Sequence, residues 1–420
     1  MGNNRLVIVG GGAAGFFCAV NAARMAPSLE VLIVEKSAKV LSKVRISGGG
    51  RCNLTHNCAS IAEMAKNYPR GERFLKKAFS QFFTRDLMDW FGQRGVELKT
   101  ESDGRVFPKS DSSQTIVDCL IQEANRYGVT LLLNREVVEI EQIDQKGAPG
   151  FLIAFSQGPS LESDYVCISP GGFPKSGQYH WLTRLGIESE NPVPSLFTFN
   201  LPDRSLAPLM GISVPDVQVK LEPMGKALRG PMLLTHWGLS GPVILKLSSL
   251  GAQVLADTGY HFWVTVNWVP EYHEQSLQEG FRRFRMEMAK KKMTNDNPFG
   301  LPRRLWEYHL QSCEIGEELR WADLPSRKAN LLIRQLAGQR LEVKGKTTFK
   351  EEFVTAGGVK LSEVDPLTMA SLKIPHLYFA GEILDVDGVT GGYNFQHAWT
   401  SGWIAARSIC ADFVEHRFDS

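Results

Sequence analysis

A glycine-rich turn near the start of the chain has the residue types and spacing of a phosphate-binding loop. The run GGGAAG fits the pattern GxGxxG and follows a short apolar segment. Gly10 allows the tight turn, Gly12 lets a diphosphate approach the main chain, and Gly15 lets the next helix pack on the strand. Ala13 and Ala14 open that helix, whose free N–H groups attract phosphates. The turn predicts a dinucleotide site.

An acidic residue stands where such a site needs one for the ribose. Apolar runs at 5–9 and 29–34 predict two buried strands around a helix at 13–26, which together make a βαβ unit. Glu35 follows the second strand, twenty residues after Gly15, where its carboxylate can accept both ribose hydroxyls. This acid disfavours a ribose 2′-phosphate and therefore NADP. FAD and NAD both remain open at this point.

The C-terminal segment decides between these two dinucleotides. LYFAGE reads as a buried strand that ends in Gly381 and Glu382, and a helix begins at GGYN. In FAD folds of the glutathione-reductase type, a strand-terminal Gly-Asp contacts the ribityl chain, and the next helix points its N-terminus at the flavin. Glu382 carries the same pair of acceptor oxygens, so we predict non-covalently bound FAD. The contacts expected from the helix are Gly391, Gly392, Tyr393, Asn394 and Gln396.

A second glycine loop, SGGGRCN at residues 47–53, permits close approach of the main chain to a flat ring. Arg51 is a candidate for stabilising negative charge at the flavin or on an anionic intermediate. The alternative is that this turn only shapes the FAD pocket. Lys43 is a candidate contact for the phosphates or the flavin. The predicted cofactor-binding residues also include Ser47, Gly48, Gly49, Asn53 and Lys36.

Two further residues are candidates for proton transfer. Cys52 can protonate a carbon after hydride transfer, as reduction of a conjugated C=C bond requires, or it is a small buried filler. His236, in THWGLSGP, can act as acid or base near neutral pH across a domain interface, or it merely bonds the backbone. The cysteines show no CxxC spacing, so neither a flavin–disulfide relay nor a metal site is predicted.

The elements that must position these residues change character along the chain. Strands at 129–133, 151–156 and 164–168 are expected to extend the first sheet, and a helix capped by Ser110 or Asp111 precedes them. Short β-rich runs with many prolines, and then helical patterns, interrupt this α/β arrangement. We therefore predict a Rossmann-type FAD-binding domain at 1–190 and 345–420, interrupted by a β-barrel-like domain at 191–270 and a helical domain at 271–344.

Composition places the chain among ordinary globular proteins. It has 420 residues, of which 43% are hydrophobic and 22% charged, and its net charge is +2. These values exclude a disordered chain, a collagen-like repeat and a coiled-coil rod. The apolar runs are too short or too glycine-rich for a membrane helix, and no leader pattern precedes the first strand. Seven scattered cysteines fit a reducing cytoplasm, which is the expected location.

Charge is unevenly spread in the predicted helical domain. Residues 281–304 and 326–350 each carry a net charge of +6, whereas residues 305–325 carry −4. Two basic stretches in a nearly neutral protein can grip phosphates of a nucleic acid. The alternative is an ordinary solvated helix face.

Four motifs identify a family resemblance. LSKVRISGGGRCNLTH, GRVFP, LLTHWGLSGP and AGEILDVDGVTGGYNFQHAW resemble, in order and spacing, the YhiN/BaiN-like bacterial FAD flavoproteins. The resemblance implies an FAD domain interrupted by a β-barrel and a helical domain, and it adds Val138 and Gly171 as FAD contacts. Members are connected with aminoacetone oxidation, reduction of bile-acid intermediates and dihydrouridine formation in large-subunit ribosomal RNA. The turn at 168–174, ISPGGFP, departs from the family pattern on the adenosine side.

Three hypotheses for the function follow. The leading one is an FAD-dependent reductase of a C=C bond, with NADH as transient reductant and a uracil ring of 23S ribosomal RNA as substrate. RNA would bind through 281–304 and 326–350. The second is an aminoacetone-type amine oxidase that uses oxygen on a small-molecule substrate. The third is a non-catalytic, FAD-stabilised RNA-binding scaffold. Because a second GxGxxG motif is missing, no separate NAD(P)H domain is predicted.

Overall fold

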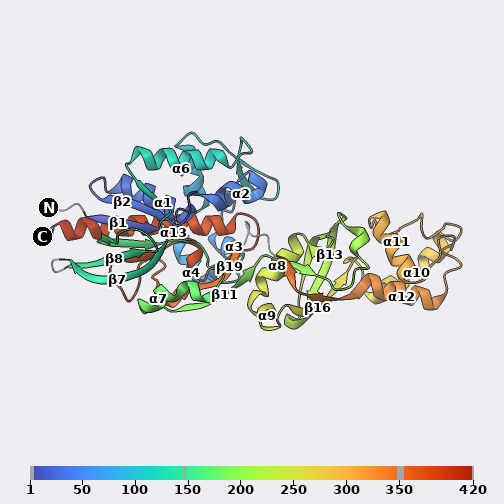
Figure 1. The fold of residues 1–420 in the computed structure, drawn as a ribbon. Helices are drawn as coiled ribbons and strands as arrows, with labels where there is room; N and C mark the ends of the chain where they lie inside the picture. The colour runs from blue at the N-terminus through green and yellow to red at the C-terminus, as the bar shows by residue number, and fades with distance from the viewer. Residues whose placement is uncertain (1–3, 146–147, 348–353, 419–420) are drawn as a thin grey trace. The chain divides into compact units, whose positions relative to one another are not determined.

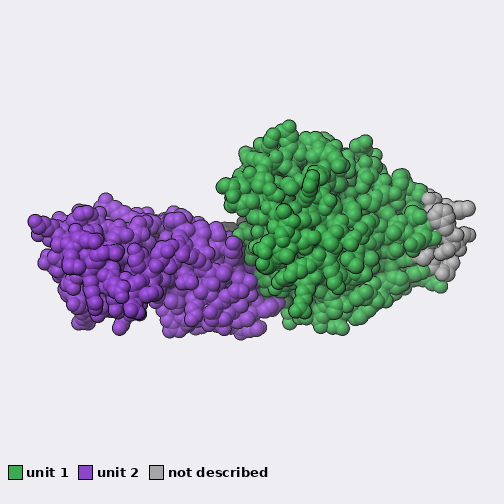
Figure 2. All heavy atoms as spheres, turned by 180° about the vertical axis from the view of Figure 1, so that it is seen from behind, with its two compact units in different colours: residues 1–195, 350–420 green, residues 196–349 purple. Residues whose placement is uncertain are grey.

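The computed structural model describes residues 4–145, 148–347 and 354–418. The chain forms two compact units, residues 1–195 with 350–420 and residues 196–349, which are coloured separately in Figure 2. Each unit has its own hydrophobic core. Lys350, which was counted in the second basic stretch, lies outside the described residues.

A five-stranded parallel sheet forms the centre of the first unit, in the order β20-β10-β1-β2-β6. The predicted strands around the glycine turn and before the C-terminal helix are confirmed. Side chains of β1 and β10 are almost completely buried, because helices and other segments cover both faces of the sheet. The strands are β1 (Arg5–Val9), β2 (Glu30–Glu35), β6 (Thr130–Leu133), β10 (Tyr165–Ile168) and β20 (Leu377–Phe379).

Two helices that are far apart in the sequence pack against each other in this unit. Figure 1 shows α13 (Tyr393–Phe418), the last helix, running past α1 (Ala13–Met25). Gly402 permits the contact, since a Cβ there would lie 2.5 Å from the carbonyl oxygen of Ala14. The packing brings the N-terminal ends of both helices to the carboxyl edge of the parallel sheet, where open α/β sheets bind ligands.

Smaller elements surround this centre. Three antiparallel sheets belong to the unit: β3-β5-β4, β7-β8-β9 and β11-β19. Their strands are β3 (Thr55–His56), β4 (Leu98–Thr100), β5 (Arg105–Pro108), β7 (Val137–Gln145), β8 (Ala148–Phe155), β9 (Leu161–Ser163), β11 (Ser189–Ser195) and β19 (Val354–Val359). The helices are α2 (Ser42–Gly50), α3 (Ile61–Ala65), α4 (Glu72–Ala78), α5 (Thr84–Gly92), α6 (Gln114–Arg126) and α7 (His180–Arg184), with short 3-10 turns at Ser176–Tyr179, Leu361–Glu363 and Gly381–Ile383.

Two sequence predictions for this unit are wrong. The strand expected at 151–156 does not extend the first sheet, because β8 pairs antiparallel with β7 and β9 in a separate sheet. Helix α6 is not capped by Ser110 or Asp111; it begins after Ser113, which provides no side-chain cap. Asp111 instead has a positive φ of 52° and binds Lys99, so the chain turns once more before the helix starts.

The second unit is built on a seven-stranded antiparallel sheet in the order β17-β16-β13-β14-β15-β12-β18. Its strands are β12 (Thr198–Asn200), β13 (Ser213–Leu221), β14 (Lys226–Leu234), β15 (Gly238–Ser240), β16 (His261–Asn267), β17 (Gln339–Lys344) and β18 (Lys346–Thr347). The helices are α8 (Pro242–Leu250), α9 (Ala252–Asp257), α10 (Glu274–Glu287), α11 (Arg303–Ser312) and α12 (Ser326–Gly338), with 3-10 turns at Ala207–Leu209 and Glu222–Met224.

The predicted helical segment 271–344 ends in a strand rather than a helix. Gln339–Lys344 alternates buried and more exposed side chains and pairs with β16. One hydrophobic core contains side chains from both the sheet and α10–α12, for example Val264 and Leu332. The sheet and the helices therefore share a core within this unit.

Within residues 4–145, 148–347 and 354–418, no helix combines the length and the hydropathy that a membrane span requires.

Candidate cofactor and active site

The turn between β1 and α1 has room for a diphosphate at Gly12 but not at Gly10 or Gly15. A Cβ on Gly10 would lie 2.4 Å from the carbonyl oxygen of Ser169, and a Cβ on Gly15 would lie 2.1 Å from that of Gly10. At Gly12, in contrast, no described atom lies within 4 Å of the Cβ position. Gly12 is the N-cap of α1 and no side chain caps this helix, so main-chain N–H groups of its first turn are available to a phosphate. These features fit a bound diphosphate.

Glu35 is held in position at the end of β2. Its Oε2 accepts a hydrogen bond from the Gly11 N–H at 2.8 Å, and its Oε1 accepts from the Ser37 N–H and hydroxyl, both at 2.9 Å. A carboxylate has about four acceptor positions, so both oxygens keep capacity for ribose hydroxyls. The geometry is compatible with the role predicted from the sequence.

A pocket of about 290 Å³ opens beside Glu35. Of the predicted cofactor-binding residues, Gly10, Glu35, Lys36 and Val138 line it. Two further lining residues, Pro170 and Phe173, come from the turn at 168–174 that departs from the family pattern. Five more follow that turn: Gly177, Gln178, His180, Trp181 and Arg184. The position of the pocket at the end of β2 suits the adenosine half of a dinucleotide.

A second group of predicted residues meets at Glu382, directly after β20. Its Oε2 forms an ion pair with Lys43 at 2.5 Å, and its Oε1 accepts from the Thr355 N–H at 3.0 Å. Gly171 lies beside it, since a Cβ there would be 3.7 Å from Oε2. Gly381 has a φ of 76° and packs against Ala14 of α1, which joins this group to the glycine turn.

Two buried polar atoms near Glu382 lack hydrogen-bond partners among the described residues. One is Nδ1 of His397, whose Nε2 donates to the Gly381 carbonyl at 3.1 Å. Burial lowers the pKa of His397 to about 4, so this imidazole is neutral and its Nδ1 is an acceptor. The other is the hydroxyl of Thr355, which lies 2.5 Å from the Cβ position of Gly172. Thr355 is not among the residues predicted from the sequence, because no motif marks it.

The predicted second glycine loop is the kinked end of α2. Ser47, Gly48 and Gly49 have non-helical angles there, and the Cβ positions of Gly49 and Gly50 face space without atoms within 4 Å. Gly48 instead packs on Phe107, 3.0 Å from its Cβ position. The loop therefore has an open face that permits the close approach of a flat ring.

Two side chains predicted to contact the flavin are occupied within the protein. Asn394 accepts from the Gly388 N–H at 2.8 Å and donates to the Gly388 carbonyl at 3.0 Å. Gln396 is fully buried, accepts from the Thr55 hydroxyl at 2.6 Å and donates to Thr400 at 3.0 Å. The Asn394 side chain holds the segment before α13 in shape, and the Gln396 side chain connects α13 to β3.

The same segment is tied to the second glycine loop. With the Asn53 amide in the orientation that suits its neighbours, its oxygen accepts from the Gly392 N–H at 3.0 Å. Gly392 itself cannot carry a Cβ, which would lie 2.6 Å from the main chain of Thr55. Tyr393, the first residue of α13, stacks on His56 with ring centroids 5.0 Å apart, and Gly391 lies beside that imidazole. His56 was missed by sequence analysis, although it stands in the LTH part of the motif.

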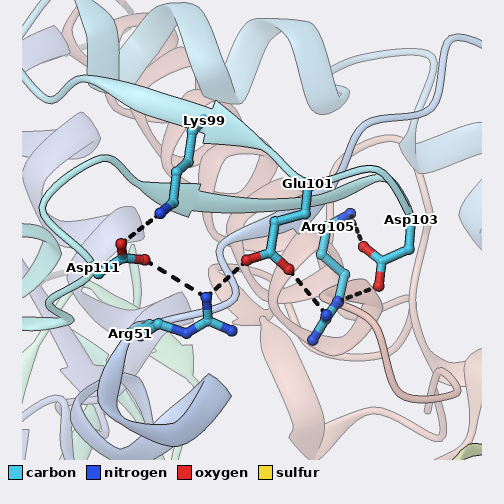
Figure 3. A network of polar contacts seen from close by, with 6 residues as sticks. All are labelled: Arg51, Lys99, Glu101, Asp103, Arg105 and Asp111. Atoms are coloured by element: carbon cyan, nitrogen blue, oxygen red, sulfur yellow. Dashed lines mark hydrogen bonds and ion pairs between the residues drawn. The ribbon is translucent and has the colours of Figure 1, made fainter.

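Arg51 takes part in a network of six charged side chains (Figure 3). Its Nη1 donates to Glu101 at 2.7 Å and lies 3.6 Å from Asp111, while the guanidinium covers the Phe107 ring at 4.1 Å. The hydrogen bond to Glu101 raises the pKa of Arg51 above its usual value. Glu101 also binds Arg105 at 3.0 Å. These contacts attach the glycine loop to the β4–β5 hairpin.

The network gives Arg51 a structural task. Three acidic and three basic side chains balance in it, since Lys99 pairs with Asp111 and Arg105 with Asp103. A guanidinium already shared between two carboxylates has less positive charge to offer an anionic intermediate. Of the two interpretations from the sequence, the geometry favours the one in which this turn shapes the pocket.

Cys52 is completely buried and has a positive φ of 61°. Burial raises the pKa of its thiol to about 12, and a hydrogen bond with Ser47 offsets only part of that increase. The thiol is therefore protonated at neutral pH. A proton donor must carry its proton, but a general acid is most effective when its pKa lies near the working pH. Complete burial also fits the alternative of a small buried filler, so the role of Cys52 in proton transfer stays a prediction.

His236 belongs to the second unit, in the turn between β14 and β15. Its carbonyl accepts a hydrogen bond from Arg204 at 2.7 Å, and its ring lies 3.7 Å from that of Trp237, centroid to centroid. The predicted contact of His236 across a domain interface stays a prediction.

Many cations of the two basic stretches are paired inside the second unit. Lys292 binds Glu318 at 2.7 Å, Arg303 binds Glu307 at 2.8 Å and Arg340 binds Glu222 at 2.9 Å. Arg285 and Arg304 donate to the main-chain carbonyls of Leu324 and Pro208. The side chains that remain well exposed include Arg282, Lys290, Arg327 and Lys344.

Comparison with known proteins identifies the family. The model of the HI0933-like protein Rossmann domain matches residues 4–408, so the chain belongs to this family. The resemblance to YhiN/BaiN-like FAD flavoproteins is thereby confirmed. Membership of this family makes the chain an enzyme of the FAD-dependent oxidoreductase class, and the residues around Gly12, Glu35 and Glu382 fit FAD. Of the three functional hypotheses, the non-catalytic scaffold is therefore set aside.

Particular relatives cover almost the whole chain. The ribosomal RNA dihydrouridine synthase of Escherichia coli (strain K12) is 30% identical over 419 residues, which is 96% of this chain and 98% of that protein. A protein of the same name from Haemophilus influenzae (strain ATCC 51907 / DSM 11121 / KW20 / Rd) is 28% identical over 96% of this chain and 98% of its own. The 3-dehydro-bile acid delta(4,6)-reductase of Clostridium scindens (strain ATCC 35704 / DSM 5676 / VPI 13733 / 19) is 28% identical with the same coverage.

Solved structures support the fold. The 3-ketosteroid delta1-dehydrogenase of Sterolibacterium denitrificans is 13% identical with a TM-score of 0.51, over 97% of this chain and 100% of that one. The 3-ketosteroid-delta4-(5alpha)-dehydrogenase of Rhodococcus jostii RHA1 is 13% identical with a TM-score of 0.50, over 97% and 98%. At such low identity these likenesses describe the fold alone.

Proposed function

We propose that this enzyme reduces the C=C bond of a uracil ring in 23S ribosomal RNA to dihydrouridine, with NADH as the reductant. The observation that carries the proposal is the similarity, over 96% of the chain, to two proteins named ribosomal RNA dihydrouridine synthase. The relative from Clostridium scindens is also named a reductase, which favours reduction over amine oxidation. A ribosomal RNA substrate places the enzyme in the cytoplasm.

The chain's own residues prepare the site in this proposal. Bound FAD supplies the hydride chemistry. The open turn at Gly12 binds the diphosphate, Glu35 binds the ribose, and the Lys43–Glu382 pair fixes the segment after β20. Cys52 keeps its proton at neutral pH and delivers it to the ring carbon next to the one that receives the hydride.

The RNA contacts in this proposal come from the second unit. Because Lys292, Arg303 and Arg340 are already paired with carboxylates, the phosphate contacts fall to exposed cations of 281–304 and 326–350. When cationic side chains bind RNA phosphates, the RNA releases its bound counterions, and this release becomes less favourable as the salt concentration rises. RNA affinity that falls steeply with salt is therefore expected.

An anaerobic stopped-flow experiment tests the proposed reaction. The FAD-loaded enzyme is reduced with NADH and mixed with a 23S rRNA fragment or with aminoacetone, while flavin absorbance is followed. We expect reoxidation by RNA without oxygen, together with dihydrouridine in the product. Reduction of the oxidised enzyme by aminoacetone, with no reoxidation by RNA, would instead establish the amine oxidase.

The role of Cys52 is tested in the same assay. Cys52→Ala should lose RNA-dependent reoxidation by a factor of 10² or more, the usual contribution of a general acid, while FAD binding and reduction by NADH persist. Cys119→Ala is the matched control, since this cysteine is also buried but lies on α6. Unchanged turnover of Cys52→Ala would remove the cysteine from the mechanism.

A further inference from the structure

Gln178 has a buried acceptor atom that faces no donor. It lies in the 3-10 turn Ser176–Tyr179 and lines the pocket next to Glu35. Its side-chain Oε1 is buried and has no hydrogen-bond partner among the described residues. A buried carbonyl oxygen without a donor is unfavourable, so such atoms in a pocket point to a bound group that supplies one.

The segment around Gln178 is fixed by its neighbours. The Gln178 N–H donates to the Lys175 carbonyl at 3.1 Å, which closes the turn. Tyr179 is buried, its hydroxyl accepts from the Phe173 N–H at 3.4 Å, and the two rings meet edge to face at 5.0 Å. Trp181 is 8% exposed and lines the same pocket. The Gln178 amide is therefore presented from an anchored wall.

The pocket is lined by both apolar and charged side chains. Val137 and Val138 of β7, Pro170, Phe173 and Trp181 are apolar, whereas Lys36, Arg135, Glu136 and Arg184 are charged. The pocket volume of about 290 Å³ suits a purine ring with its ribose. The apolar side chains suit the faces of such a ring, and Oε1 of Gln178 is an acceptor for a donor on its edge.

The exocyclic amine of adenine is the hydrogen-bond donor that best suits Oε1 of Gln178. Adenosine can donate from its ribose hydroxyls and from its exocyclic amine. Glu35, held by Gly11 and Ser37, provides acceptors for the ribose hydroxyls. We propose that Gln178 determines specificity for the adenine of FAD by accepting a hydrogen bond from the exocyclic amine. The inference rests on FAD binding alone and is independent of the proposed RNA substrate.

Equilibrium binding to the full-length apoprotein tests the proposal. Dissociation constants are measured from flavin fluorescence for FAD and for an FAD analogue whose purine lacks the 6-amino group. Wild type should prefer FAD by about tenfold, the typical value of one buried hydrogen bond. Gln178→Leu should bind FAD about tenfold more weakly and show no preference. Gln178→Glu, which keeps the acceptor, should retain the preference.

The control is Gln278→Leu, an exposed glutamine of α10 in the second unit, which should behave like wild type. Comparing the two ligands within each variant separates recognition from damage to the fold, because a distorted pocket weakens both equally. A preference that survives in Gln178→Leu would overturn the proposal, and so would a wild type that binds both ligands equally. Neither outcome depends on whether RNA is reduced, so a failure of the proposed reaction is recognised separately.

Discussion

Two glycines of the same motif should respond oppositely to the same substitution. Gly12→Ala places a methyl group where no atom lies within 4 Å, and the φ of −91° suits alanine. Alanine is less favourable than glycine at a helix N-cap, which destabilises the folded protein. Alanine also reduces the conformational entropy of the unfolded chain, which stabilises the folded protein by a similar amount. The free energy of unfolding of the apoprotein should therefore change by less than about 0.5 kcal/mol.

Gly15→Ala forces a methyl group to 2.1 Å from the carbonyl oxygen of Gly10, and that oxygen is main chain, so strand and helix must move apart. Overpacking of this kind costs about 1–3 kcal/mol, which lowers the melting temperature by roughly 3–10 °C in a unit of this size. FAD affinity should fall about 100-fold or more in Gly12→Ala, because the methyl group takes the place of the diphosphate.

Thermal unfolding of the apoproteins and fluorescence titration with FAD measure both effects. The expected pattern is a stable Gly12→Ala protein that binds FAD poorly and a destabilised Gly15→Ala protein. If Gly12→Ala bound FAD as tightly as wild type, the assignment of the open space to the diphosphate would be refuted. If Gly15→Ala melted at the wild-type temperature, the packing argument would be wrong.

Two further predictions concern buried titratable groups of the first unit. The pKa of His397 is lowered to about 4, so below pH 6.5 the unfolded chain binds a proton that the folded chain does not. The free energy of unfolding should therefore fall between pH 6.5 and 4 by up to about 3 kcal/mol. Denaturant titrations at several pH values measure this dependence, and His397→Gln should weaken it. Asp387 is completely buried, pairs with Arg70 and accepts from the Ser195 hydroxyl at 2.7 Å, so Arg70→Met should cost about 3–5 kcal/mol by removing the guanidinium that balances the charge of this buried carboxylate. The exposed pair Lys66–Glu63 provides the control, since Lys66→Met should change the urea midpoint little; equal effects of the two variants would contradict the argument.

Local sequence patterns determined the elements that bind the dinucleotide. The apolar runs at 5–9 and 29–34, the glycine spacing and the strand before Gly381 each depend on residues close in the chain, and the structure places β1, β2, α1 and β20 accordingly. Strand β8 was assigned to the wrong sheet, because an apolar strand shows its burial but not its partner. The strand at 339–344 was overlooked for a similar reason, as six residues after a helix carry little periodicity.

The chemistry around the site depended on contacts between distant residues. From the sequence, Arg51 was a candidate for charge stabilisation, but Glu101, fifty residues later, holds it on the hairpin. Asn394 and Gln396 are predicted flavin contacts, and only the structure shows that their side-chain amides also bind Gly388 and Thr55. Glycine spacing and strand patterns are local properties of the chain, so the sequence alone could predict the cofactor. Which polar groups are satisfied, and which remain free for a ligand, depends on partners that only the folded chain brings together.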